Sequence, residues 1–188
     1  MTISTKDHCP LVYILTPSYN CGQYIYRLLN SVLTQTYPNI EMTVIDDGST
    51  DNTKDIIISY QFKFAARGYK LNYVYQNNQG LSSTINNGLK LVHGDFLIWP
   101  DADDWYCRDD AIEKMVVTFE NNINLGIVRI GKQYVDEHTF CSIGTVVFMK
   151  RNNIFHDCLL SKNGYFFAAG GDMLRVSLLD EFIPKREI

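Results

Sequence analysis

Stretches typical of buried strands alternate with stretches typical of amphipathic helices over the first hundred residues. The strand-like runs are continuous and apolar, and they are residues 11–15, 42–45, 71–75 and 96–99. The helix-like segments, with apolar residues about 3.6 positions apart, include residues 25–33, 56–60 and 81–92. Such alternation predicts right-handed crossovers and an α/β fold with a mostly parallel sheet, in which ligands bind beyond the carboxyl ends of the strands.

Each predicted strand in this part of the chain is followed directly by a polar stretch. These stretches are residues 16–20, 46–51, 77–80 and 101–104. Taken singly, each is typical of a surface loop. Because the carboxyl ends of parallel strands meet at one edge of a sheet, the four stretches together predict a binding site at that edge.

The last of these stretches carries three carboxylates within four residues, those of Asp101, Asp103 and Asp104. Like charges this close raise one another's pKa unless a cation lies between them. Carboxylate oxygens suit Mg²⁺ or Mn²⁺, and an ion held by one or two protein carboxylates completes its shell with water and phosphate oxygens. The stretch therefore predicts either a metal site for a nucleoside diphosphate or an acidic loop whose last Asp caps the next helix.

Composition and charge argue against several other classes of protein. The 188 residues, 46% hydrophobic and 20% charged, suit one globular domain with a sizeable core. A formal charge of -4 without a basic cluster argues against nucleic-acid binding. Five cysteines without a C-x-x-C pair argue against a disulfide framework or a zinc site. No apolar run approaches the roughly 18 residues of a membrane-spanning helix, so we expect a soluble, cytoplasmic chain.

The four polar stretches resemble the motifs of family 2 of the glycosyltransferases, which have the GT-A fold. The matching segments are Thr16-Pro17-Ser18-Tyr19-Asn20, Val44-Ile45-Asp46-Asp47-Gly48-Ser49-Thr50-Asp51, Asn78-Gln79-Gly80 with Asn86-x-Gly88-Leu89, and the D-x-D-like Asp101-x-Asp103-Asp104. Their order and spacing agree as well, strongly over residues 11–120 and weakly beyond. The resemblance implies a single GT-A domain, residues 1–188, with a nucleotide-sugar-binding half at about 11–106 and an acceptor-side half at about 107–188.

The resemblance also implies roles for individual residues. Pro17 and Tyr19 would shape the pocket for the base, and Asp46 would accept a hydrogen bond from the uracil or ribose. Asp101 would face the ribose and sugar. Asp103, together with Asp104, would hold Mg²⁺ or Mn²⁺, which neutralises charge on the departing diphosphate. The other residues expected to contact the donor are Thr16, Asp47, Gly80, Asn86 and Ala102.

A late segment, residues 166–174, resembles the family's glycine-(Glu)-Asp element at the start of a helix, with Gly171 in place of the usual Glu. Asp172 matches the catalytic base, which takes the proton from the acceptor hydroxyl. Without the resemblance, the pattern favours a helix N-cap at Asp172, because leucines follow it at helical spacing. Asp136 and Glu137 are the other candidates for the base.

The second half carries weaker signals. Residues 112–119 have helical spacing, and either Asp109 or Asp110 could cap that helix. Residues 125–135 and 145–149 are expected to be strands. Members of the resembled family usually continue further, so the chain is expected to be a truncated or minimal catalytic core.

The predicted function is metal-dependent transfer of a sugar, with inversion, from a UDP-sugar to a carbohydrate, lipid-linked or other hydroxyl acceptor. Thr84-Ile85-Asn86 stands where many family members have Ala-Arg-Asn, which removes a cation available to the diphosphate and leaves open a binding module without transfer activity. A nucleotidyltransferase would require a basic phosphate loop after the first strand, and residues 16–22 contain neither Lys nor Arg. Membrane association is expected only at the inner face, through a region beyond this chain.

Overall fold

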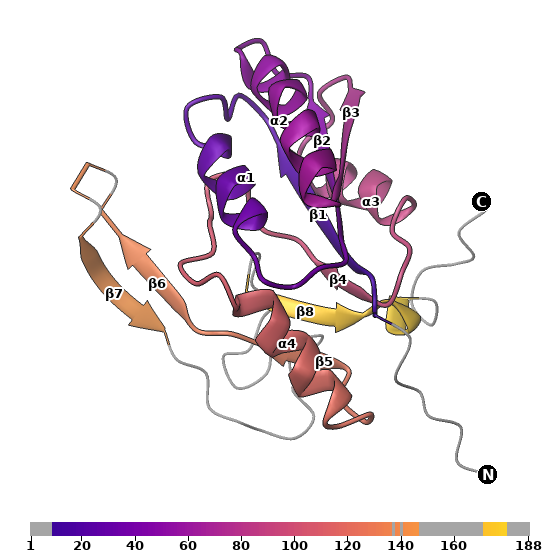
Figure 1. Cartoon of the computed structure of the whole chain (residues 1–188). Coiled ribbons are helices and arrows are strands. Elements are labelled where there is room, and N and C mark those ends of the chain that lie inside the picture. Colours follow the sequence, from indigo (N-terminus) through magenta and orange to yellow (C-terminus); the bar gives the residue numbers. More distant parts are fainter. Residues whose placement is uncertain (1–8, 137, 140, 147–170, 180–188) are drawn as a thin grey trace.

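The computed structural model describes residues 9–136, 138–139, 141–146 and 171–179. Strands and helices alternate through the first 120 residues, as the sequence predicts (Figure 1). These elements are β1 (Val12–Ser18), α1 (Ile25–Leu33), β2 (Ile40–Asp47), α2 (Thr53–Arg67), β3 (Lys70–Gln76), α3 (Leu81–Leu89), β4 (Phe96–Ile98) and α4 (Ala111–Glu120). The later elements are β5 (Ile127–Arg129), β6 (Lys132–Val135), β7 (Ser142–Val146), β8 (Asp172–Arg175) and the short 3-10 helix η2 (Val176–Leu178).

A six-stranded sheet with the strand order β3-β2-β1-β4-β8-β5 forms the centre of the fold. The pairs among β1 to β4 are parallel, whereas β8 runs antiparallel to both β4 and β5. The chain moves outward from β1 to β3 and then returns to the other side of β1 as β4. The loops that leave β1 and β4 therefore diverge at a switch point, where open α/β sheets bind their ligands.

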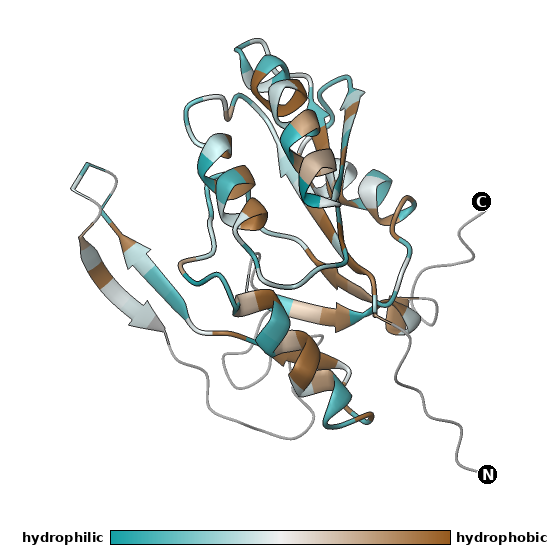
Figure 2. Cartoon of the chain, in the orientation of Figure 1, coloured by the Kyte–Doolittle hydropathy of each residue, from teal (hydrophilic) through white to brown (hydrophobic). Residues whose placement is uncertain are grey.

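Helices cover both faces of this sheet, and a separate core forms on each face. In β1, Val12 and Ile14 belong to one core, whereas Tyr13 and Leu15 belong to the other, because successive side chains of a strand alternate. All four are at most 2% exposed. The first core packs against α1, α2 and α4, and the second includes residues of the α3 region and η2. The apolar sides of the helices face the sheet (Figure 2), which explains why the strands read as continuous apolar runs.

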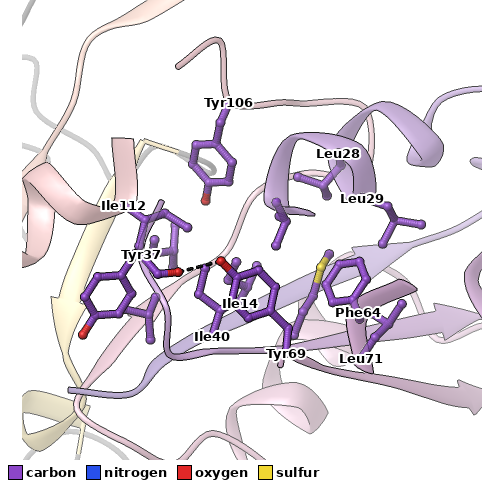
Figure 3. Close-up of a cluster of buried hydrophobic side chains, with 14 of the residues drawn as sticks. Ile14, Leu28, Leu29, Tyr37, Ile40, Phe64, Tyr69, Leu71, Tyr106 and Ile112 are labelled. Carbon is purple, nitrogen blue, oxygen red and sulfur yellow. Dashed lines mark hydrogen bonds between the residues drawn. The ribbon is translucent and has the colours of Figure 1, made fainter. Parts of the chain in front are cut away.

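Tyrosine hydroxyls fix the amino ends of the strands within the larger core (Figure 3). Tyr69, between α2 and β3, donates its hydroxyl to the backbone oxygen of Tyr37 (2.6 Å). Tyr37, just before β2, donates in turn to the backbone oxygen of Pro10, just before β1. Three connections are thus joined at the edge of the sheet that lies opposite the polar loops.

The structure corrects two expectations for the second half. Residues 125–135 form two strands rather than one, since β5 joins the main sheet and β6 pairs with β7 in a separate two-stranded sheet. The segment after Asp172 begins as β8 and not as a helix. Met173 and Leu174 belong to opposite cores, which is the alternation of a strand buried on both faces. A short apolar run cannot be assigned to helix or strand from periodicity alone.

The expected strand at 145–149 overlaps β7 at its first two residues, and its remainder lies outside the described part of the chain. No helix in the described ranges is long and apolar enough to cross a membrane.

Candidate active site

Asn20 joins the loops that leave β1 and β2. Its backbone N–H donates to Ser49 Oγ (2.9 Å), and its side-chain oxygen accepts from the Thr50 N–H (2.8 Å). Asn20 has a φ of 49°, a left-handed conformation that Asn adopts more readily than most residues. Ser49 and Thr50 therefore hold the β1 loop. Asp51 accepts the N–H of Thr53 at the start of α2 (3.0 Å).

Asp46, the predicted contact for the base or ribose, lies near the end of β2 and is 1% exposed. Its Oδ1 accepts from the Ser49 N–H (2.8 Å), and its Oδ2 accepts from the Tyr73 hydroxyl (2.7 Å). Burial and the neighbouring Asp46 charge raise the pKa of Tyr73, so its hydroxyl stays a donor. These two bonds fix the carboxylate and leave further lone pairs on it.

Sequence reasoning misses Tyr73. The signal for it lies in the strand register, because Tyr73 pairs with Val44, two residues before Asp46. Residues two apart in a strand share a face, so Tyr73 and Asp46 are diagonal neighbours.

Asp47 holds the loop between β3 and α3. Its Oδ1 accepts from Gln76 Nε2 (2.7 Å) and the Gln79 N–H (2.8 Å), and its Oδ2 accepts from the Gly80 N–H (2.9 Å). Burial works against ionisation, but these donors keep the pKa of Asp47 below its usual value. Gly80 has a φ of 83° as the chain enters α3, a conformation that favours glycine. The structure thus places Gly80 at the polar edge, and Asn86 lies exposed further along α3.

The carboxyl end of β1 supplies three of the predicted donor contacts. Thr16 and Pro17 are buried, and Tyr19 is 51% exposed just beyond the strand. The Thr16 hydroxyl has no hydrogen-bond partner among the described residues. This end of β1 therefore presents an accessible aromatic ring next to the loops that Asn20 joins.

The acidic loop, residues 101–104, follows β4 at the switch point beside β1. The Asp104 N–H donates to the Asp101 backbone oxygen (3.1 Å), which closes a turn around the buried Ala102. Burial and the charge of Asp103 raise the pKa of Asp101. Burial, together with the neighbouring carboxylates, raises the pKa of Asp104 to about 6, although Lys132 of β6 acts in the opposite direction. Negative charge therefore exceeds positive charge in this loop, which is the electrostatic condition that favours a bound cation.

The acidic loop lies near the loops of β1 and β2. Burial raises the pKa of the Cys21 thiol, and the charges of both Asp103 and Asp51 add to that shift. The Cys21 N–H donates to Thr53 Oγ1 (2.9 Å). Asp47 accepts hydrogen bonds from the loop between β3 and α3, so that loop lies beside the others. The four polar stretches therefore meet at one edge of the sheet, as the strand order predicts.

The donor set of the acidic loop suits a divalent cation that is only partly enclosed by protein. Within the described ranges, no three His, Cys, Asp or Glu side chains are arranged to hold a metal ion. Asp103 is exposed and Asp104 is half-buried. Mg²⁺ bound by one or two carboxylates takes its other ligands from water and phosphates. A cation held by Asp103 and Asp104 would therefore need its remaining ligands from water or from a bound ligand.

A pocket of about 770 Å³ extends from the acidic loop towards α4 and β6. This volume lies within the range of small-molecule sites, about 300–1,000 Å³. Its walls come from α1, residues 100–108, the first turn of α4 and residues 130–135. Aromatic and charged side chains dominate, among them Tyr24, Arg27, Trp105, Arg108, Lys114 and Lys132.

Asp172, the predicted base, forms a buried ion pair with Arg129 across β8 and β5. Arg129 Nε donates to Asp172 Oδ1 and Nη2 donates to Oδ2, both at 2.6 Å. The two side chains are 4% and 1% exposed. The alternative of a helix cap at Asp172 is wrong, because Asp172 begins a strand. Sequence reasoning misses Arg129, although a charged residue in a short apolar strand is a signal for a buried partner.

Gly171 connects this pair to the acidic loop through Lys132. A Cβ atom at residue 171 would lie 2.7 Å from Lys132 Cε, so a larger residue there would require the flexible end of the lysine side chain to shift. The charge of Lys132 acts on both Asp101 and Asp104. Sequence reasoning misses Lys132 because no local pattern links β6 to the acidic loop.

Comparison with known proteins gives a consistent result. The sequence model of the family described as Glycosyl transferase family 2 matches residues 13–183. Relatives include GlyA of Streptococcus pneumoniae (34% identity over 117 residues), RT0329 of Rickettsia typhi, an uncharacterized glycosyltransferase (40% over 132), and chondroitin synthase of Escherichia coli (32% over 133). The alignments cover 61%, 70% and 71% of this chain. They cover 16%, 39% and 19% of the relatives, so the chain spans well under half of their length.

Solved structures show the same architecture. Residues 1–349 of TarS from S. aureus align with a TM-score of 0.69 at 23% identity, covering 92% of this chain and 49% of that chain. The mannosyltransferase PcManGT from Pyrobaculum calidifontis aligns with a TM-score of 0.58 at 22% identity, covering 71% and 38%.

A mostly parallel sheet that continues into antiparallel strands beyond an acidic loop is the GT-A fold of glycosyltransferases. The chain belongs to glycosyl transferase family 2.

Proposed function

We propose that the protein transfers a sugar from a UDP-sugar to a hydroxyl group of a carbohydrate or lipid-linked acceptor, by a single displacement with inversion. The observation that carries this proposal is that two loops lie close together at one edge of the sheet: the Asp46 loop (residues 46–51, at the end of β2) and the acidic loop (residues 101–104, after β4). One loop offers a fixed carboxylate for a nucleoside, and the other offers carboxylates for a cation on a diphosphate. In support, TarS structures contain UDP and UDP-GlcNAc, and the PcManGT structure contains GDP-Man and Mn²⁺.

The nucleoside would bind at the carboxyl ends of β1 and β2. Asp46, oriented by Tyr73, would accept a hydrogen bond from the uracil or ribose, and the exposed ring of Tyr19 would pack against the base beside Pro17. The buried Thr16 hydroxyl offers a further polar contact. Asp47 acts through the Gly80 loop, whose backbone it positions. In this assignment residues 11–106 bind the donor and residues 107–188 face the acceptor.

The diphosphate would lie over the acidic loop. Asp103 and Asp104 would hold Mg²⁺ or Mn²⁺, which supplies Lewis-acid stabilisation of the leaving group when it is bound. Asp101 would face the ribose and sugar next to Ala102. Lys132 contributes a fixed positive charge on the acceptor side of the same loop.

Asp172 is the proposed base, with Arg129 as the residue that orients it. The bidentate contact uses one lone pair on each carboxylate oxygen and leaves others to accept a proton. Its burial supports a purely structural ion pair as the alternative. Asp172→Asn, assayed under conditions in which the variant is shown to be folded, should lower turnover by roughly 10² to 10⁴ while UDP affinity stays unchanged. Normal turnover by folded Asp172→Asn would leave only the structural role and direct the search to Asp136 or to Glu137, which lies outside the described residues.

Thermal unfolding with UDP tests the donor site. UDP should raise the melting temperature when Mn²⁺ is present and much less in chelator, because a ligand that binds the native state stabilises it by mass action. Asp103→Asn should abolish this coupling, whereas Asp55→Asn, an exposed position on α2, should preserve it. Equal stabilisation by UDP with and without metal in the parent protein would contradict the metal assignment.

A panel of nucleotide sugars tests the reaction itself. Hydrolysis or transfer should occur with UDP-sugars and Mn²⁺, and Asp46→Ala should weaken UDP binding by about tenfold, the loss expected for a charge-assisted hydrogen bond. Tight UDP-sugar binding with neither hydrolysis nor transfer would identify a binding module instead. That outcome is the one the replacement of a family cation by Ile85 would explain.

A further inference from the structure

Two separate groups of charges line the pocket beyond the acidic loop. Lys132 acts on Asp101 and Asp104 at the end next to the proposed diphosphate site. Arg108 and Lys114 lie at the start of α4 and line the same pocket. Their charge acts on a different carboxylate, that of Asp110. The pocket wall therefore carries the carboxylates of the acidic loop and, separately, a pair of cations around the start of α4.

Asp110 holds both cations of this pair. Arg108 Nε and Nη2 donate to its two oxygens at 2.8 Å, and Lys114 Nζ lies 2.8 Å from Oδ2. Asp110 occupies the N-cap position of α4, as the sequence suggests, but its side chain makes no capping bond, because the two cations take it. These three side chains alone carry a net charge of +1, and Asp109 and Glu113 add two negative charges to the same segment.

The orientation of this group directs its positive charge into the pocket. Arg108 and Lys114 are lining residues, and Asp110 is not among those that line the pocket in the described part of the chain. The Arg108 and Lys114 side chains are each 62% exposed, so a ligand can reach them, whereas Asp110 is 31% exposed. Asp110 thus acts as an anchor that fixes two cations side by side at the pocket wall.

Aromatic side chains form the surface between these two groups of charges. Trp105 and Tyr134 line the pocket, and Tyr134 is 56% exposed. The guanidinium of Arg27 lies 5.7 Å from the centre of the Trp105 ring, which holds the indole in place from the α1 side. Rigid aromatic rings offer an apolar surface with defined faces, suited to the C–H face of a sugar ring.

We propose that this pocket binds an acceptor sugar that carries an anionic group, a carboxylate or a phosphate, placed against Arg108 and Lys114. The carboxylates of the acidic loop would repel an anion at the other end of the pocket, so the ligand has one favourable orientation. In that orientation its uncharged hydroxyl side faces the acidic loop. The inference rests on the proposed function, because it names the acceptor class of the same site.

The test compares matched charged and neutral glycosides as ligands of the protein saturated with UDP and Mn²⁺. The probes are methyl β-glucuronide for a carboxylate, methyl glucoside 6-phosphate for a phosphate, and methyl β-glucoside as the neutral control, with binding measured by ligand-observed NMR. At low salt the charged probes should bind about fivefold more tightly than the neutral one, the effect expected of two partly exposed ion pairs. Raising the salt to about 0.5 M should reduce the difference, since the Debye length shortens to a few ångströms.

Variants assign the preference to the pocket. Arg108→Gln combined with Lys114→Gln should abolish the preference and leave binding of the neutral glycoside and of UDP unchanged. Asp110→Asn should increase the preference, because it removes the negative charge that offsets the two cations. Lys63→Gln, at an exposed lysine on α2 remote from the pocket-lining residues, is the matched control and should change nothing.

Equal binding of charged and neutral glycosides by the parent protein, or a preference that survives in the double variant, would overturn the inference. Either result with normal UDP binding would leave the proposed function intact. Failure of the parent protein to bind UDP would instead count against the proposed function. A preference for only one of the two charged probes would identify the anionic group as carboxylate or phosphate.

Discussion

Removing one partner of the Arg129–Asp172 ion pair should destabilise the protein much more than replacing both. The two side chains are 4% and 1% exposed and are joined by two bonds of 2.6 Å. Loss of one partner removes both charge-assisted bonds from a charge that stays buried between strands β5 and β8, and breaking a buried pair costs about 3–5 kcal/mol. Replacing both residues with apolar side chains of similar volume is close to neutral or stabilising by about 1–4 kcal/mol. Because a native domain is stable by only about 5–15 kcal/mol, either single variant should be marginal.

Urea unfolding of Arg129→Met, Asp172→Leu and the double variant, followed by circular dichroism, measures these differences. The double variant should be more stable than either single variant, which gives a large favourable coupling energy in the double-mutant cycle. Arg108→Met is the control, since its pair with Asp110 is exposed to solvent and should contribute little to stability. Single variants that lose less than about 1 kcal/mol would show that the pair is solvated in solution and would refute the reasoning from burial.

Three further predictions address the donor edge. Tyr73→Phe removes the hydroxyl that donates to Asp46 and should weaken UDP binding about threefold to tenfold, as measured by calorimetry. Tyr75→Phe, at an exposed position of the same strand, should leave UDP binding unchanged. Equal UDP affinities of the two variants would show that Tyr73 does not orient Asp46 for the nucleotide. The pKa of Asp47 is lowered in the folded state, so Asp47 stabilises the fold above its unfolded pKa of about 4, and this stabilisation is lost as the pH falls through the folded pKa. Asp47→Asn should therefore make the free energy of unfolding fall less steeply between about pH 5 and low pH, as measured by urea unfolding. An unchanged pH dependence in the variant would contradict this assignment. Gly88→Ala places a Cβ atom 2.5 Å from a side-chain methyl group of the buried Leu15 of β1. The cost of overpacking, about 1–3 kcal/mol, should exceed the gain in helix propensity of about 1 kcal/mol, so urea unfolding should show a net loss of stability. Unchanged stability would show that the neighbouring side chains move aside.

The donor half of the fold was predictable because its information is local. Strands β1, β2 and β4 are buried along their whole length, the edge strand β3 is partly exposed, and each of the four is followed by a polar loop. Strict alternation with helices implies parallel strands joined by right-handed crossovers, and the carboxyl ends of parallel strands, with the loops that follow them, lie at one edge of the sheet. The expected four strands differ from the observed ones by only a few residues at their ends.

The second half was less predictable because its pairings are not local. Strand β8 lies between β4 and β5, and nothing in the neighbourhood of Asp172 specifies those partners. Its two central residues alternate between the cores, but four residues are too few to separate this alternation from a helical pattern. The same holds for Arg129, whose partner lies 43 residues away.

Lys132, in the second half of the chain, acts on the acidic loop of the first half. The sequence carries Ile85 and Gly171 where the family pattern described above has an Arg and a Glu. In the structure the glycine leaves space for Lys132, since a Cβ atom at residue 171 would meet that side chain. Lys132 then acts on Asp101 and Asp104 from the hairpin of β6 and β7. Lys132 therefore supplies positive charge to the acidic loop from the second half of the chain, through a pairing that no local pattern in the sequence specifies.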